Sequence, residues 1–419
     1  MARDLVIVGN KIPQHSHEGN ISYGLARRAV GEMKRRLKDT LATPAATQAS
    51  VTSTLADHVL HALPKKTTLS RALRKYRQKW NAHGDTALPP IPNDRNFEMP
   101  ERFSHFVQFD SGPGVDRIII LGCHELIDGL ARASMWLADG TFKTVPDLFF
   151  QLYTIHFQFV KGVNPAALYC LLPNKTRATY DRLLQEVVRL IPWVAPRIIL
   201  TDFEMAAMGA FQEKFPDART TGCYFHLAQS VIRKVHEVGL KVEYETNKDV
   251  RIAVRCLAAL SHVPVQDVTE AFELLSDSMP AINNIDEVLT YFEHTYIRGR
   301  RMRGRGENYK PALFAIETWN QMQTIGDGVA RTNNICEGWH NSLQSLLQCS
   351  HPTMWRFLDG LLMDCTKQKI NFLQGVAGAN YPAEKRYQIM YGKVQRAVET
   401  YGQTDVLTYL RAIAHLSFS

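Results

Sequence analysis

The chain has 419 residues, of which 45% are hydrophobic, and its formal net charge is +8. This length and composition suffice for a large hydrophobic core and for more than one domain. No apolar run reaches the roughly 18 residues that a transmembrane helix needs, and the first residues turn polar too early for a signal peptide. The seven cysteines are scattered and odd in number, which indicates reduced thiols. We therefore expect an intracellular protein, cytosolic or nuclear, with no membrane partner.

The positive charge is concentrated in the first hundred residues. Residues 1–100 contain 16 Lys and Arg against 8 Asp and Glu, and the rest of the chain contains 33 of each. A basic segment beside a neutral body is typical of a polyanion-binding arm, because contacts from Lys and Arg to phosphates supply most nonspecific affinity for nucleic acids. Solvated helical faces are the alternative interpretation, and charge alone does not separate the two.

Three helices are predicted in the basic segment, at 21–40, 44–63 and 69–80, with Thr67 or Thr68 capping the third. Before them, His15 and His17 have the spacing of half a zinc site, but no cysteine precedes them to complete it. The third helix is basic on one side, so we expect either a DNA-binding module of helix-turn-helix type or a plain helical appendage. Its candidate DNA-contacting residues are Arg71, Arg74, Lys75, Arg77 and Lys79.

A mixed α/β domain is predicted after a proline-rich linker. Three prolines between residues 88 and 92 exclude a helix or a central strand there. Strands are expected at 116–122, 133–139, 149–159 and 167–172, and then helices at 176–190, 205–215 and 226–238 alternate with strands at 197–201 and 220–225. Consecutive strands followed by alternating helix and strand predict a mixed sheet with helices on its faces.

The rest of the chain is predicted to be helical. Residues 240–330 show helical patterns only, with a break at 277–280 and a basic, glycine-containing stretch at 298–305. This stretch is typical of a mobile loop that contacts phosphate or serves nuclear import, and an exposed loop with no partner is the alternative. Its candidate residues are Arg298, Arg300, Arg301, Arg303 and Arg305. Helices are expected at 332–348, 354–373, 384–401 and 405–415.

Three acids are the candidate catalytic residues. Asp139 and Asp202 each follow an apolar, strand-like run, and Glu337 lies in the helix predicted at 332–348. A carboxylate at the end of a buried strand is tolerated only when it is paired, hydrogen-bonded or bound to a cation. Two aspartates on neighbouring strands, with a third carboxylate from a later helix, are what a two-metal phosphoryl-transfer site needs.

Four motifs in this order resemble the Mutator-like element (MULE) transposase family: Asp139-Gly-Thr-Phe-Lys143, Thr201-Asp-Phe-Glu204, Cys223-Tyr-Phe-His226 and Arg331-Thr-Asn-Asn-Ile-Cys-Glu-Gly-Trp-His-Asn341. The resemblance covers roughly residues 60–375. It implies a ribonuclease-H-like core in which Asp139, Asp202 and Glu337 are a DDE triad that holds two Mg²⁺ or Mn²⁺ ions. It also implies that the helical stretch between Asp202 and Glu337 is the family's insertion.

Cys223 and His226 belong to a motif beside the predicted core, and His340 follows Glu337 in the last motif. A cysteine at a strand end and a histidine starting a helix are two zinc ligands, but two ligands do not make a closed site. Zinc ligation, a structural or DNA-positioning role and plain packing therefore stay open for this pair. Trp339 is expected in the core rather than as a base-stacking platform.

The resemblance implies a nuclear DNA transposase that cleaves element ends and joins them to target DNA. Its partners would be double-stranded DNA, as terminal repeats and target, and further copies of the chain, since two ends must meet. The alternative is a domesticated, transposase-derived DNA-binding protein without activity. Zinc is not expected. The predicted organisation is 1–20 remnant of a Cys/His finger, 21–87 basic helical region, 88–100 linker, 101–240 core, 241–330 insertion, 331–375 core helix with the third acid, and 376–419 C-terminal helices.

Overall fold

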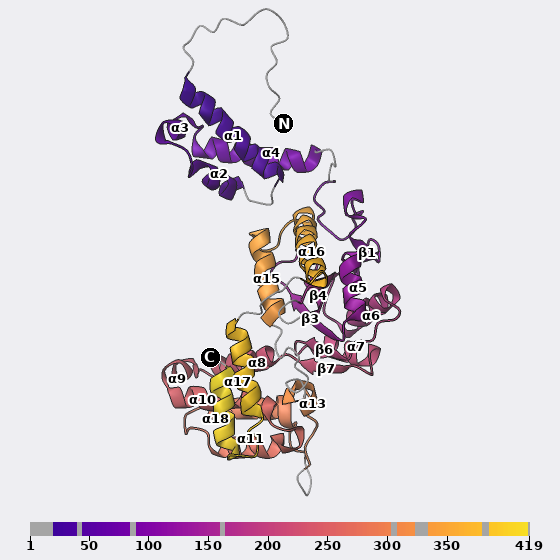
Figure 1. Ribbon diagram of the computed structural model, residues 1–419, viewed down its shortest axis with the longest axis vertical. Helices are drawn as coiled ribbons and strands as arrows, with labels where there is room; N and C mark the ends of the chain where they lie inside the picture. The colour runs from indigo at the N-terminus through magenta and orange to yellow at the C-terminus, as the bar shows by residue number, and fades with distance from the viewer. Residues whose placement is uncertain are drawn as a thin grey trace, which may run out of the picture. The chain divides into compact units, whose positions relative to one another are not determined.

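The computed structural model describes residues 20–39, 44–83, 89–159, 164–302, 308–322, 334–378 and 385–417. The chain divides into two compact units, Met1–Pro90 and Ile91–Ser419 (Figure 1). His15 and His17, the predicted finger remnant, lie outside the described residues.

The first unit is a small helical bundle. Its helices are α1 (Ile21–Asp39), α2 (Pro44–Thr52), α3 (Asp57–Ala62) and α4 (Lys66–His83). Apolar residues at helical spacing on α1, including Met33 and Leu37, pack against Val51 of α2 and against Leu69 and Leu73 of α4. The unit therefore has a hydrophobic core of its own.

Two predictions in this unit are wrong in detail. The single helix expected at 44–63 is broken between α2 and α3, where the hydroxyls of Ser53 and Thr54 donate to the carbonyls of Ser50 and Val51. Such local side-chain bonds compete with the helical backbone pattern. The third helix begins at Lys66, so Thr67 and Thr68 lie inside it rather than at its N-cap.

The second unit contains a seven-stranded mixed sheet. Its strands are β1 (Val107–Asp110), β2 (Ile119–Leu121), β3 (Met135–Thr141), β4 (Gln151–Phe157), β5 (Ala166–Leu172), β6 (Ile198–Thr201) and β7 (Arg219–Gly222), in the order β1-β2-β5-β4-β3-β6-β7. β3 pairs parallel with β6, and β6 parallel with β7, whereas the other pairs are antiparallel. The order β5-β4-β3-β6-β7 is ribonuclease-H-like, so the predicted fold class is confirmed.

Helices cover this sheet, as the alternating pattern predicted. They are α5 (His124–Arg132), α6 (Arg177–Leu190), α7 (Met205–Lys214), α8 (Tyr224–Glu237), α15 (Asn334–Leu347) and α16 (Met354–Val376), with a short 3₁₀ helix at Glu101–Phe103. β1 and α5 are not predicted from the sequence. β1 has four half-buried residues and no apolar alternation, and α5 is only nine residues long with no side-chain cap, so neither carries a strong local signal.

The two faces of β3 have different neighbours. Met135 and Leu137 point to one face, where they form a buried cluster with Leu200, Cys223 and Cys336 of α15. Trp136 points to the other face and contacts the ring of Phe215, just after α7. Because side chains alternate along a strand, Asp139 lies on the same face as Leu137, the face that α15 covers.

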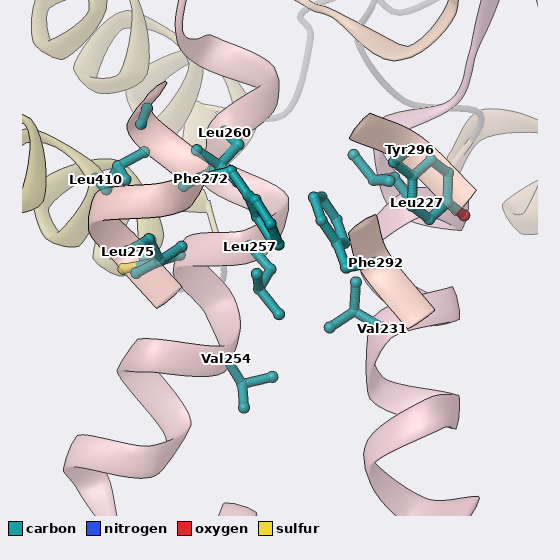
Figure 2. Close-up of a cluster of buried hydrophobic side chains, with 14 of the residues drawn as sticks. Leu227, Val231, Val254, Leu257, Leu260, Phe272, Leu275, Phe292, Tyr296 and Leu410 are labelled. Atoms are coloured by element: carbon teal, nitrogen blue, oxygen red, sulfur yellow. The ribbon is translucent and has the colours of Figure 1, made fainter. Parts of the chain in front are cut away.

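The remaining helices of the second unit build a second core. They are α9 (Lys241–Thr246), α10 (Lys248–Ala259), α11 (Val268–Asp277), α12 (Ile285–Phe292), α13 (Ile316–Trp319), α17 (Lys385–Val398) and α18 (Val406–Ser417), with 3₁₀ turns at Leu260–His262 and Val265–Asp267 and a π-helical turn at Glu293–Ile297. Figure 2 shows Leu257, Phe272 and Phe292 of this core facing Val231 of α8. Leu410 of α18 is buried in the same cluster. The C-terminal helices α17 and α18 therefore complete the core that α8 to α13 build.

No described helix is both long enough and apolar enough to cross a membrane.

Candidate active site

The parallel pairing of β3 and β6 brings the two predicted aspartates side by side. Leu137 of β3 pairs with Leu200 of β6, and continuing this register by two residues sets Asp202 beside Asp139. Neighbouring strands are separated by about 4.8 Å. Residues that are far apart in the sequence thus meet at the carboxyl edge of the two strands, where α/β folds commonly place their sites.

Asp139 lies within β3, opposite Thr154 of β4. Its side chain is 4% exposed, and its Oδ1 accepts a hydrogen bond of 2.9 Å from the backbone N–H of Gly140. Its Oδ2 lies 3.8 Å from Nδ1 of His340 on α15. Burial, with the nearby charges of His156 and His226, lowers the pKa of His340 to about 3. His340 is therefore neutral at physiological pH and forms no ion pair with Asp139.

Asp202 directly follows β6 and has an unfavourable environment for a charged carboxylate. Burial and, to a smaller extent, the charge of Glu204 raise its pKa to about 6, although hydrogen bonding to the Glu204 backbone and the charge of Lys175 act in the opposite direction. Its Oδ1 is buried and accepts no hydrogen bond from any described residue. Buried carboxylate oxygens normally have a partner, so this atom is suited to a cation.

Glu204 is an additional acid of the site that sequence analysis did not select. It occupies the N-cap position of α7 with extended backbone angles, φ −93° and ψ 108°. Burial raises its pKa, and a hydrogen bond with Tyr180 and the charge of Lys175 oppose this shift. The Thr201–Glu204 motif carries the signal, because it contains a second acid two residues after Asp202.

Two tyrosines and a glutamine lie near the acids of the site. Tyr153 of β4 is fully buried, and burial, the neighbouring Tyr180 and the charges of Asp202, Asp139 and Glu204 raise its pKa well above the usual value. Gln151 donates a 2.7 Å hydrogen bond to the hydroxyl of Tyr180. These phenols stay protonated at all physiological pH values, so they supply hydroxyl groups and no negative charge.

The segment that carries Asp202 and Glu204 is anchored by the residue between them. The ring of Phe203 lies 5.6 Å from that of Tyr296 and 5.0 Å from that of Phe314, both in the second core. A Cβ atom added to Gly222 would lie 2.3 Å from this ring. The absence of a side chain at Gly222 thus leaves space for the ring of Phe203. The packing of this ring holds the backbone between Asp202 and Glu204 in place.

Helix α15, which contains position 337, packs on β3 through an apolar contact and is linked to α16 and β5 by buried polar contacts. The side chain of Glu337 lies outside the described residues, but its neighbour Cys336 is buried in the β3–β6 cluster. Trp339 is 7% exposed, which confirms its expected place in the core, and its Nε1 donates a 2.7 Å hydrogen bond to Oδ2 of Asp364 on α16. The hydroxyl of Tyr169 donates to the same oxygen at 2.9 Å.

Cys223 and His226 lie at the start of α8, beside the site. The helix begins at Tyr224, two residues earlier than predicted, so buried Cys223 is its N-cap and His226 lies in its first turn. The backbone N–H of Cys223 donates to the carbonyl of Thr201 at 2.9 Å. Burial and the charge of Arg233 lower the pKa of His226 to about 4, and burial lowers that of His156 to about 4. His156, His226 and His340 are thus neutral side chains near the acids.

Among the described side chains, no group of three or more His, Cys, Asp or Glu lies close enough to hold a metal ion. The third predicted ligand, Glu337, is not among those side chains. Asp139 and Asp202 nevertheless fit a hard divalent cation, because both are carboxylates at one strand edge and Asp202 has a buried oxygen with no described hydrogen-bond donor.

The predicted DNA-contacting residues differ in exposure. Arg71, Arg74 and Lys75 are exposed on α4 and Arg77 is half-buried. In the second basic stretch Arg300 and Arg301 are exposed. The side chains of Lys79, Arg303 and Arg305 lie outside the described residues.

The second basic stretch is more ordered than predicted. Arg298 forms ion pairs of 2.8 Å with Glu273 and 2.7 Å with Glu293. Gly299 and Met302 donate backbone hydrogen bonds to Lys310 and Asn308. The expected mobile loop is therefore, over its described residues, a short antiparallel ribbon, because this pairing satisfies its backbone.

The structure has a mixed sheet with two carboxylates at the edge of its parallel strands. This arrangement is the one expected of a ribonuclease-H-like fold. Comparison with known families agrees: residues 135–230 match the model described as the MULE transposase domain. The chain thus carries a MULE transposase domain. The matched segment includes Asp139, Asp202, Cys223 and His226, but not Glu337. No curated protein matches the chain. The domain indicates a transposase-related function, and such a function implies a DNA substrate.

Proposed function

We propose that the protein is a metal-dependent DNA transposase that hydrolyses a phosphodiester at an element end and joins the freed 3′-OH to target DNA. One observation carries the proposal. The register of β3 and β6 sets Asp139 beside Asp202, and His340 of α15, three residues after position 337, lies against Asp139. All three predicted acids thus come from elements that meet at one strand edge.

Asp139, Asp202 and Glu337 would hold two Mg²⁺ or Mn²⁺ ions. When bound, such ions activate the attacking oxygen and stabilise the leaving oxygen of the phosphodiester. Asp202 supports this assignment, since burial disfavours its charged form and a cation would favour it. Glu204 is a further carboxylate within the range of charge interaction of Asp202.

The side chains around the carboxyl edge of β3 and β6 leave the negative charge of the acids available to a cation. His340 is neutral, so it does not neutralise Asp139 as a charged histidine would. Tyr153 stays protonated, so it adds no negative charge beside the acids. Phe203 fixes the segment between Asp202 and Glu204. Water and then a 3′-OH serve as nucleophiles, and no covalent protein–DNA intermediate is needed.

DNA binding outside the active site is assigned to the basic residues. Arg71, Arg74 and Lys75 share the exposed side of α4, and Arg300 and Arg301 form a second positive segment. Contacts from such residues to phosphates position DNA without reading its sequence. The protein would act in the nucleus as a homo-oligomer, because terminal repeats at two element ends must be joined to one target.

Strand cleavage and joining by the purified chain test this function. The substrate is DNA carrying the candidate terminal repeats, in Mg²⁺ or Mn²⁺, with Asp139→Asn, Asp202→Asn and Glu337→Gln in parallel. We expect metal-dependent products from the wild type only, with DNA binding retained in all variants. DNA binding without products from the wild type would contradict catalysis and indicate a domesticated binding protein.

A further inference from the structure

A polar cavity lies beside the C-terminal half of α15. Its volume is about 410 Å³, and it is lined by Asn341, Gln344, Ser345, Gln348, Cys349 and Ser350. Three of these side chains, Asn341, Gln344 and Ser345, are amides or hydroxyls on the helix itself, and none of the six carries a charge. A site of this composition suits a ligand that offers both hydrogen-bond donors and acceptors.

The cavity follows the helix face that leads away from the predicted catalytic position. Asn341 and Gln344 come one and two turns after position 337, and residues at these spacings share one face of a helix. Gln348 directly follows the last residue of the helix. With a rise of 1.5 Å per residue, Gln344 and Gln348 lie roughly 10 and 17 Å along the axis from that position. His340, adjacent to Asn341, marks the active-site end through its approach to Asp139.

The far end of the cavity is fixed to the connection between β3 and β4. Gln348 and His351 have left-handed backbone conformations, φ +53° and +47°, which are uncommon for residues other than glycine. The backbone N–H of His351 donates to the carbonyl of Lys143 at 3.1 Å, and its Nδ1 bonds the carbonyl of Val145 at 3.1 Å. The cavity wall is therefore tied to the segment that follows Asp139.

This connection adds groups that suit DNA. Lys143 is exposed, and its backbone carbonyl bonds His351, which directly follows Ser350 of the cavity wall. Phe142 and Phe150 are 44% and 46% exposed, and their rings pack edge to face with centroids 5.4 Å apart. A cation and two half-exposed aromatic rings on the connection that is tied to the cavity wall favour nucleic acid over a small metabolite or a metal ion.

We propose that this cavity is a DNA subsite in which α15 contacts base edges and backbone next to the cleaved phosphate. The inference rests on the proposed function. Distances of 10 to 17 Å along the helix correspond to roughly three to five base pairs at about 3.4 Å each. Asn and Gln amides hydrogen-bond adenine through two atoms at once, so Asn341 and Gln344 are specificity-determining residues for the terminal bases.

Site-directed cross-linking tests this inference, because Cys349 provides a partly exposed thiol in the cavity wall. Duplexes with a pre-cleaved 3′ end carry one base with a disulfide-activated tether, placed one to eight base pairs from that end. The Cys349 thiolate attacks the tether and releases a small thiol. We expect cross-linking to be strongest at about three to five base pairs and to be lost in Cys349→Ser.

A binding measurement provides the second arm. Asn341→Ala and Gln344→Ala should each weaken binding of the end duplex about tenfold and reduce discrimination among terminal bases. Ser342→Ala is the matched control, because Ser342 is exposed on the same helix but does not line the cavity. Cross-linking that is uniform with position, or absent, would overturn the inference, as would amide variants that behave like the control.

The two proposals fail in different ways. Cross-linking requires bound DNA but no cleavage, so a position-dependent cross-link without strand cleavage would refute catalysis and support the subsite. Strand cleavage by a protein that shows no position-dependent cross-link would refute the subsite and support catalysis. A chain that binds no duplex would refute both.

Discussion

Removing the charge at position 202 should stabilise the folded protein. The pKa of Asp202 rises from 3.8 to about 6, mainly through burial, which is a difference of about two units. One unit corresponds to roughly 1.4 kcal/mol, so keeping this carboxylate charged costs the folded state about 3 kcal/mol at neutral pH. Asp202→Asn removes that cost while retaining the size of the side chain. We therefore expect a more stable but inactive variant.

The stability difference between Asp202→Asn and wild type should increase with pH. Below pH 3.8 the carboxyl is protonated in both folded and unfolded chains, so wild type and variant should have similar stability. Between pH 3.8 and about 6 the unfolded chain loses the proton first, and the advantage of Asp202→Asn should grow. Above about pH 6 the difference should be constant.

Thermal or chemical unfolding from pH 4 to 8 measures this difference, first without divalent cations. Asp217→Asn, at an exposed aspartate, is the control and should change stability by less than about 0.5 kcal/mol. Added Mg²⁺ or Mn²⁺ should then stabilise the wild type and not Asp202→Asn, because a ligand stabilises the state that binds it. An Asn variant that is less stable than wild type at pH 7.5 would refute the reasoning.

Two other substitutions test the contacts that support the acids. Gly222→Ala should lower the free energy of unfolding by about 1–3 kcal/mol and reduce activity, because the new Cβ would meet the ring of Phe203. Gly392→Ala, on an open helix surface, is the control and should be neutral or slightly stabilising. Unfolding curves that rank the two variants alike would contradict this. Asp364→Leu should destabilise the fold by at least ~2 kcal/mol, because it leaves the buried donors of Tyr169 and Trp339 without their acceptor. Asp364→Asn should retain more of the stability. Urea unfolding separates the two variants, and an unchanged midpoint for the leucine variant would refute the role of Asp364 as a structural acceptor.

The order of the core elements and the two aspartates could be predicted because their signals are local. Each aspartate ends an apolar run that is long enough for a buried strand, and helical patterns alternate with strands after residue 176. Such periodicity reflects burial on a sheet or helix face. The family motifs then selected these acids from many others in the chain.

The supporting contacts could not be predicted, because they join residues that are far apart in the sequence. Tyr169 and Trp339 meet on Asp364, and Phe203 packs on Phe314. No local pattern encodes such pairs. The break between α2 and α3 was missed for the opposite reason, since hydroxyl-to-backbone bonds of single residues decided it.

The central claim is that Asp139, Asp202 and Glu337 share one metal centre, and iron-directed cleavage of the chain tests it most directly. Fe²⁺ replaces Mg²⁺ at oxygen-ligand sites, and with ascorbate and peroxide it generates radicals that cut the backbone near the bound ion. We predict cuts near residues 139, 202 and 337 together, suppressed by Mg²⁺ or Mn²⁺, lost in Asp139→Asn and retained in Asp217→Asn. Cuts near only one of these positions, or cuts that Mg²⁺ does not suppress, would contradict the account.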